Sequence, residues 1–246
     1  MRKLVLIGLT LTAMSAVTAV AVAQYAMPVM TANGSIVAAK KGKSSKKKPK
    51  NATVNVGFNI NPESRTTIDS ITFTLPKDIR LDGTGFRTCA ADAINASGPS
   101  VCRKGSQVGT GTAQAVLGGP NPSPLNFTVT IYAGGRKSLT LFLETALFNI
   151  AIPATIVGQK VIVPIPERVY RPVGGLYAYV TSVNAKLGPA KVRTRKGRKR
   201  KTRYFASLRG CSSKTHAFSV TVTTRPNPNP PPVPSLTASA TSPCRR

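Results

Sequence analysis

The residues of this chain with the most specific chemistry are four cysteines, Cys89, Cys102, Cys211 and Cys244, and a single histidine, His216. Thiols and an imidazole can hold a metal ion, but no two of these cysteines have the C-x2-C spacing of structural zinc sites. The alternative is disulfides, for which four cysteines allow three pairings. We predict Cys89–Cys102, which closes an irregular segment, and Cys211–Cys244, which ties together two strands near the C-terminus. By the chain-entropy relation each contributes roughly 3–4 kcal/mol.

Nothing in the sequence points to catalysis. His216 is in phase with Phe218, Val220 and Val222 on one face of an extended segment, a position typical of a structural histidine. No G-x-S-x-G nucleophile elbow occurs. The seven carboxylates are more consistent with ion pairs and turns, and a hydrolase would need a cleft in which two of them face each other. They are Glu63, Asp69, Asp78, Asp82, Asp92, Glu144 and Glu167. We therefore predict a protein that is not an enzyme, with no catalytic residue, cofactor site or metal ligand.

Positive charge dominates the composition, with 35 Lys and Arg against 7 Asp and Glu, a formal net charge of +28. Most of this charge lies in two blocks, residues 40–50 with seven cations and residues 191–203 with nine. Strand-like segments flank the second block, so we predict a protruding β-hairpin over residues 190–203 with a cationic tip. Its cations are predicted to bind a polyanion, with affinity that falls steeply with salt. These cations are Lys191, Arg193, Arg195, Lys196, Arg198, Lys199, Arg200, Lys201 and Arg203. No aromatic residue interleaves with them, so base stacking is not indicated.

The N-terminal segment has the pattern of an export signal. Arg2 and Lys3 precede an apolar run that ends in Ala21-Val22-Ala23, an A-x-A cleavage site, so residues 1–23 are predicted to be a signal peptide. The alternative is an uncleaved membrane anchor, and a second candidate cleavage site follows residue 39. We expect a secreted or cell-surface protein, in which an oxidising environment favours disulfides. Residues 24–51 are rich in Lys, Ser, Gly and Pro, and we predict a disordered lysine-rich linker there.

From residue 52 onward the pattern is that of short strands. Apolar residues alternate over residues 52–60, 67–75 and repeatedly over 125–187, and Pro and Gly separate these runs. The first two runs are predicted to be adjacent strands joined by the turn at residues 61–64. Extended runs over residues 215–224 and 235–242 flank a Pro-rich loop at residues 225–234. We predict one all-β domain over residues 52–246, an antiparallel β-sandwich of Greek-key, immunoglobulin-like or jelly-roll-like type.

Several motifs together resemble a group of uncharacterised, exported actinobacterial proteins, over roughly residues 52–246. They are ITFTLP at residues 71–76, the two cysteines of the 88–113 segment with its SQVGTGTA ending, VIVPIP at 161–166, GGLYAYVTSV at 174–183 and the final SPCRR. The resemblance implies an all-β, disulfide-bearing surface domain. It brings no established activity, ligand or catalytic residue.

The function expected from these patterns is non-catalytic association with the cell envelope. The expected partners of the basic segments are an anionic envelope polymer, lipid headgroups or extracellular nucleic acid. The alternative is a carbohydrate- or lipid-binding module that uses a face of the sandwich near Tyr177 and Tyr179.

Overall fold

The computed structural model describes residues 26–40, 42–119, 121–196, 199–225 and 235–244. The predicted signal peptide at residues 1–23, Arg198 of the basic hairpin and residues 226–234 of the predicted Pro-rich loop lie outside the described residues.

Antiparallel strands make up most of the described chain, which confirms the predicted all-β class. One large sheet has 13 strands in this part of the chain, in the order β15-β14-β3-β9-β8-β7-β6-β5-β10-β2-β13-β4, with β1 on the other edge of β2. A separate pair is formed by β11 and β12. The strands are β1 Met30–Ala38, β2 Lys50–Ile60, β3 Ile68–Thr74, β4 Ile79–Leu81, β5 Gln107–Leu117, β6 Ser123–Gly135, β7 Ser138–Glu144, β8 Asn149–Val157, β9 Lys160–Pro164, β10 Ala178–Leu187, β11 Lys191–Lys196, β12 Lys199–Tyr204, β13 Ala206–Leu208, β14 Thr215–Thr224 and β15 Ser235–Pro243.

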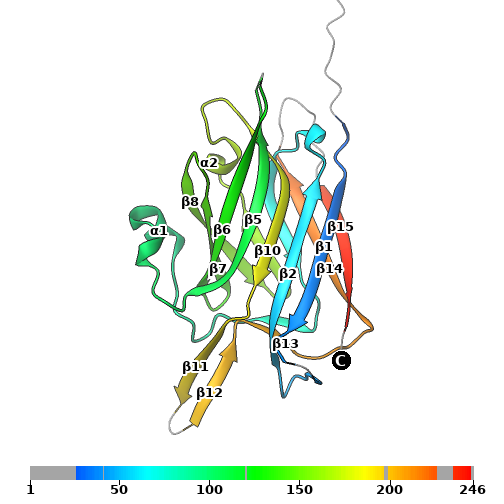
Figure 1. The fold of residues 1–246 in the computed structure, drawn as a ribbon, viewed down its shortest axis with the longest axis vertical. Helices are drawn as coiled ribbons and strands as arrows, with labels where there is room; N and C mark the ends of the chain where they lie inside the picture. The colour runs from blue at the N-terminus through cyan, green and yellow to red at the C-terminus, as the bar shows by residue number, and fades with distance from the viewer. Residues whose placement is uncertain (1–25, 41, 120, 197–198, 226–234, 245–246) are drawn as a thin grey trace, which may run out of the picture.

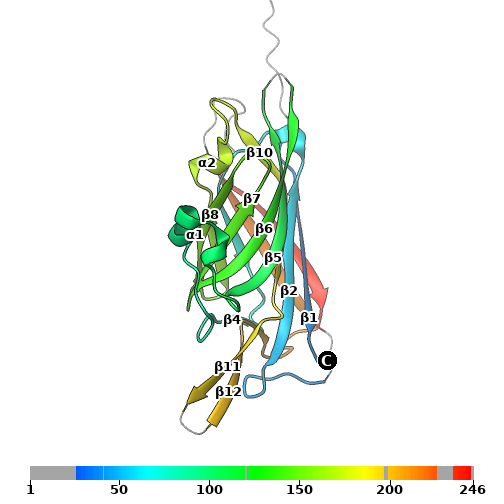
Figure 2. The same ribbon diagram turned by 60° about the vertical axis from the view of Figure 1, so that its left-hand side comes forward.

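The large sheet folds over on itself, so that its two halves face each other as the layers of a sandwich. In Figure 1, β6, β5, β10, β2 and β1 form the front layer, with β7, β8, β14 and β15 behind. β15, at one end of this strand order, lies beside β1, the strand on the other edge of β2 (Figure 1, Figure 2). The alternating apolar residues predicted from the sequence fill the space between the layers. Phe58 of β2 and Phe73 of β3, for example, face each other with ring centroids 6.2 Å apart.

The predicted disordered linker over residues 24–51 is wrong for residues 30–38, which form β1, and for Lys50 and Asn51, which begin β2. β1 pairs with β2 along its whole length, from Met30↔Ile60 to Ala38↔Ala52. Its core-facing positions are Met30, Ala32, Gly34, Ile36 and Ala38, and at Gly34 the ring of Phe218 from β14 occupies the place where a side chain would begin. Gly34 interrupts this apolar alternation and the two alanines add little to it, so the hydrophobic pattern of β1 is weaker than that of the later strands. Cleavage at the second candidate site, after residue 39, would remove this strand.

The predicted adjacency of the first two strands after residue 52 is also wrong. β2 pairs with β1, β10 and β13, whereas β3 pairs with β14 and β9. The short 3-10 helix η1 Pro62–Ser64 separates them, and Arg65 after it has a left-handed φ of 47°. This turn carries the chain from one layer of the folded sheet to the other instead of into a neighbouring strand of the same layer.

Two short helices lie outside the sheet. α1 Ala91–Ser97 packs on β7 and β8, where Ile94 joins Phe142 and Ala151 in a small apolar cluster beside the Cys89–Cys102 disulfide. α2 Glu167–Tyr170 follows β9 at the end of the sheet opposite to β11 and β12 (Figure 1, Figure 2). Both predicted disulfides are present, and Cys211–Cys244 ties the start of the β14 segment to the end of β15, as expected.

Candidate functional site

The predicted basic hairpin is formed by β11 and β12, which pair from Lys191↔Tyr204 to Lys196↔Lys199 and project from one end of the sheet (Figure 1, Figure 2). The side chains of Lys191, Arg193 and Lys201 are exposed, and that of Arg203 is half-buried near the base. Arg195, Lys196, Lys199 and Arg200 belong to the two strands. The hairpin itself is confirmed, and polyanion binding by its nine cations stays a prediction.

A carboxylate near the base of the hairpin is held in its charged form. Asp82 follows β4, and its Oδ2 lies 3.4 Å from Nη2 of Arg80 while its Oδ1 accepts a hydrogen bond of 3.0 Å from the backbone N–H of Thr84. Burial alone would raise the pKa of Asp82, but the hydrogen bonds from Thr84 and the charges of Arg80 and Arg203 outweigh burial and lower this pKa below its ordinary value. Asp82 therefore offsets part of the positive charge at the base of the hairpin, where Arg80 and Arg203 lie.

Two further cationic features lie at the same end of the molecule. The lysine-rich run that connects β1 to β2 is one of them (Figure 1, Figure 2), and its Lys43, Lys46, Lys47 and Lys48 are exposed. The other is a pocket of about 270 Å³ between β4, the β6–β7 turn, the β8–β9 turn and the segment after β13. Its charged lining residues are five cations and the paired Asp82. The cations are Lys77, Arg80, Arg136, Lys137 and Arg209.

The pocket cations were missed from the sequence. They come from three short segments, residues 77–80, residues 136–137 and Arg209, and none of these segments is a charged block in the sequence. Backbone hydrogen bonds fix these segments against one another, among them Gly83 N–H to Arg136 O, Ile156 N–H to Lys137 O and Arg209 N–H to Asp78 O. We call the hairpin 191–204, the lysine-rich run and this pocket together the basic end.

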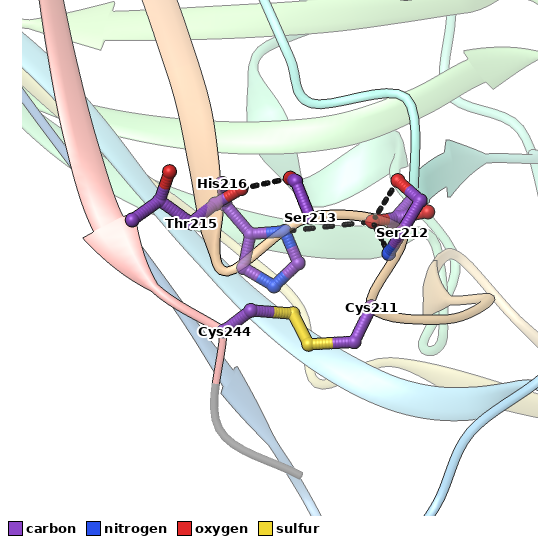
Figure 3. A network of polar contacts seen from close by, with 7 residues as sticks. Cys211, Ser212, Ser213, Thr215, His216 and Cys244 are labelled. Atoms are coloured by element: carbon purple, nitrogen blue, oxygen red, sulfur yellow. Dashed lines mark hydrogen bonds and ion pairs between the residues drawn. A yellow bond between two sulfur atoms is a disulfide. The ribbon is translucent and has the colours of Figure 1, made fainter.

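His216 lies in a polar network beside the Cys211–Cys244 disulfide (Figure 3). Its side chain is 3% exposed, and Nδ1 lies 3.9 Å from Oδ2 of Asp78 without a hydrogen-bond partner in the described structure. The same Oδ2 accepts hydrogen bonds of 2.9 Å from both the backbone N–H and the hydroxyl of Ser212. One ligand atom each from Cys211, His216 and Cys244 lies within 4.8 Å of the others.

This network has the residue types of a Ser-His-Asp triad but not its connectivity. In a triad the serine hydroxyl bonds the histidine, whereas here the Ser212 hydroxyl donates to Asp78, the carboxylate that should orient the imidazole. Ser213 donates instead to the backbone carbonyl of Thr215. The arrangement therefore gives no activated nucleophile, although it does place the imidazole of His216 beside the sulfurs of the predicted Cys211–Cys244 pair.

Burial sets the protonation of His216. Burial lowers its pKa below the ordinary value of 6.5, and the nearby Asp78 carboxylate offsets only part of this effect. In the unfolded chain the imidazole takes up a proton near pH 6.5, while in the folded protein it resists protonation. Stability from this group is therefore complete above about pH 6.5 and declines as the pH falls below that value.

We predict that acidification from about pH 7.5 to about pH 5.5 lowers the free energy of unfolding more in the natural protein than in a His216→Gln variant. The difference is at most about 1.4 kcal/mol per pH unit for one proton. Urea unfolding of both proteins at the two pH values, with disulfides intact, measures it. Equal pH dependence of the two proteins would show that His216 does not have a depressed pKa.

A polar hollow of about 380 Å³ lies on the outer face of the sheet, across β1, β2, β10 and β5. The strand register aligns Asn33 with Gly57, Gly57 with Asn184 and Asn184 with Thr112, so amide and hydroxyl side chains stand in a row. A Cβ atom at Gly57 would lie 2.6 Å from Oδ1 of Asn184, so any larger residue at this position would collide with Asn184 and fill part of the hollow. Asn55, Thr110 and Lys186 line the next row.

The expected tyrosine platform is not formed. Tyr179 is only 8% exposed, and a bulge between Val180 and Ser182 changes which residues of β10 share a face. After the bulge Val183 packs on the core, whereas Asn184 lines the polar hollow. Tyr177 lies just before β10 and stacks on Tyr170, with ring centroids 6.5 Å apart. The sequence alternation could not reveal this, because a bulge shifts the period by one residue.

Comparison of the chain with protein-family models, with curated proteins and with solved structures gave no match. Within the described ranges, neither helix is long and apolar enough to span a lipid bilayer.

Proposed function

We propose that this protein is exported, is not an enzyme, and associates with the cell envelope by contacting polyanions through its basic end. The observation that carries the proposal is the convergence of three cationic features from distant parts of the chain on one end of the sheet (Figure 1, Figure 2). Charges gathered at one end create a directed field that attracts an anionic chain, whereas evenly spread charges would not. The two disulfides are compatible with an extracellular location.

The proposed partner is a chain that carries phosphate or carboxylate groups at regular intervals. The hairpin offers exposed cations along β11, and the pocket offers five cations around a volume that admits one anionic group. An envelope phosphodiester polymer, a layer of anionic lipid headgroups and nucleic acid share this chemistry. Binding releases counterions in each case, so affinity must fall as salt rises.

Retention of the full chain on three immobilised probes tests the proposal: a glycerol-phosphate polymer, vesicles with an anionic phospholipid, and double-stranded DNA. We expect retention at low salt and release at high salt, and the probe that is released at the highest salt identifies the source of the anion. Retention that is absent, or that does not change with salt, would contradict the proposal.

Carbohydrate binding at the polar hollow is the second candidate function. It is supported by the aligned amide and hydroxyl side chains of Asn33, Asn55, Asn184 and Thr112, which can donate to and accept from sugar hydroxyls. Asn33 and Asn184 already bond to each other, Nδ2 to Oδ1 at 3.3 Å, which orients both amides toward the same space.

The expected result for this second function is that Asn184→Ala weakens binding of a neutral polysaccharide by roughly ten-fold, the loss of one to two hydrogen bonds. Arrays of neutral and charged glycans read by the natural protein and the variant measure it. A control variant, Thr221→Ala, removes an exposed hydroxyl on β14 away from the hollow. Equal binding by the Asn184→Ala variant would exclude the hollow as the site.

A further inference from the structure

We propose that opening of the Cys211–Cys244 disulfide creates a zinc site whose protein ligands are the sulfurs of Cys211 and Cys244 and the imidazole of His216. This zinc site does not depend on polyanion binding, and it forms only when the Cys211–Cys244 disulfide is reduced. Disulfide and zinc exclude each other, because both use the same two sulfur atoms.

The positions of the three groups fit a tetrahedral ion. Zinc binds thiolate sulfur at about 2.3 Å and imidazole nitrogen at about 2.0–2.1 Å, so ligand atoms around it are roughly 3.3–3.8 Å apart. The ligand atoms here already lie within 4.8 Å of one another, and the Cα atoms of the two cysteines are 5.9 Å apart. Reduction lets the sulfurs separate by rotation of their side chains, without movement of β14 or β15.

The surroundings of His216 are those of a metal-bound histidine. A histidine that binds zinc through one ring nitrogen generally directs the other at a carboxylate, which fixes the orientation of the ring. In Figure 3 one ring nitrogen of His216 points toward the disulfide, while the other, Nδ1, is directed at the carboxylate of Asp78. Ser212 holds that carboxylate in place with two hydrogen bonds.

Two buried polar atoms in this region lack partners in the described structure. They are Nδ1 of His216 and the hydroxyl oxygen of Ser242, the residue directly opposite His216 in the β14–β15 pairing. Buried polar groups without partners are uncommon, because each costs about 1–3 kcal/mol. A zinc ion on the other nitrogen would strengthen the Nδ1–H to Asp78 interaction, and a water on the ion's fourth position could bond the Ser242 hydroxyl.

In vitro, a phosphine can reduce the Cys211–Cys244 disulfide. The phosphine and one water molecule convert the disulfide to two thiols, and the phosphine leaves as its oxide. Zinc then displaces one proton from each thiol, and the resulting site, with two thiolates and one neutral imidazole, is electrically neutral. A protein dithiol serves the same purpose in a cell, where it is itself oxidised to a disulfide.

Cobalt(II) is the probe for this site, because a tetrahedral thiolate site gives it intense visible bands and a sulfur charge-transfer band. We expect the full chain to bind one cobalt per molecule after phosphine reduction and none before it. The Cys89–Cys102 pair is an internal control, since His216 is the only histidine of the chain. A Cys89→Ser, Cys102→Ser variant should keep the cobalt bands, and a Cys211→Ser, Cys244→Ser variant should lose them.

Two variants distinguish the role of His216, a proposed zinc ligand, from that of Asp78, which positions the imidazole. His216→Gln should weaken cobalt binding by more than 100-fold, whereas Asp78→Asn, which keeps all three ligands, should weaken it by about 10–100-fold. In addition, zinc should raise the thermal midpoint of the reduced natural protein and leave that of the oxidised protein unchanged. Absence of tetrahedral bands after reduction, equal binding by His216→Gln, or no effect of zinc on the reduced protein would each overturn the proposal.

Discussion

Adding a single methyl group at Gly34 will lower the free energy of unfolding by about 1–3 kcal/mol, the usual cost of overpacking a core. A Cβ atom at this position would lie 2.4 Å from Cγ of Phe218, deep inside van der Waals contact. Phe218 belongs to β14 and is almost fully buried, so its ring cannot move toward solvent. This contact joins β1 to β14, so the substitution at Gly34 tests whether β1 packs as part of the domain.

A double-mutant cycle isolates this contact. Phe218→Ala alone should cost about 3–5 kcal/mol, as a large-to-small core substitution. In that background Gly34→Ala should cost little or even stabilise, since the methyl enters the vacated space. Gly174→Ala is the matched control, because a Cβ there would meet no atom within 4 Å. Urea unfolding measures the four proteins of the cycle and the control, and an equal cost of Gly34→Ala in both backgrounds would mean that β1 does not pack on Phe218.

Removing two charges from the hairpin will weaken binding to a phosphodiester polymer by about thirty-fold. The variant is Lys191→Gln, Arg193→Gln, at exposed alternate positions of β11. Each cation near an anionic surface contributes about 1 kcal/mol, and a change of 1.36 kcal/mol is ten-fold in affinity. The plot of log affinity against log salt should also become less steep, by about 1.8 if both cations contact phosphates of a duplex.

The control for net charge is Arg168→Gln, Arg171→Gln, at α2 and the residue after it, at the opposite end of the sheet (Figure 1). Both variants lose two positive charges, so a general effect of net charge would weaken binding equally. If the two variants bind alike at every salt concentration, the basic end is not the binding surface. Titration with a fluorescent polymer over a range of salt concentrations gives both slopes.

The sequence alone determined those features that depend on local pattern. Two-residue alternation identified most of the strands from β2 onward, because a half-buried strand requires it whatever its partners are. The short strand β4 was not among them, because it lies in the segment that was expected to be irregular. The hairpin of β11 and β12 followed from two strand-like flanks around a solvated cationic turn. Both disulfides followed from the elements that each cysteine pair would close.

Other features were decided only by tertiary structure. Which strands pair depends on how a turn directs the chain, so β2 and β3 came to lie apart despite their short connection. Strand β1 forms because it pairs with the edge of β2 and packs on the ring of Phe218. Gly34 by itself does not indicate either contact. The cationic pocket joins segments that are far apart along the chain, and the pairing of β14 with β15 brings Cys244 beside His216. Both sites depend on which segments lie close together in space, and the alternation of side chains along a single strand does not specify this.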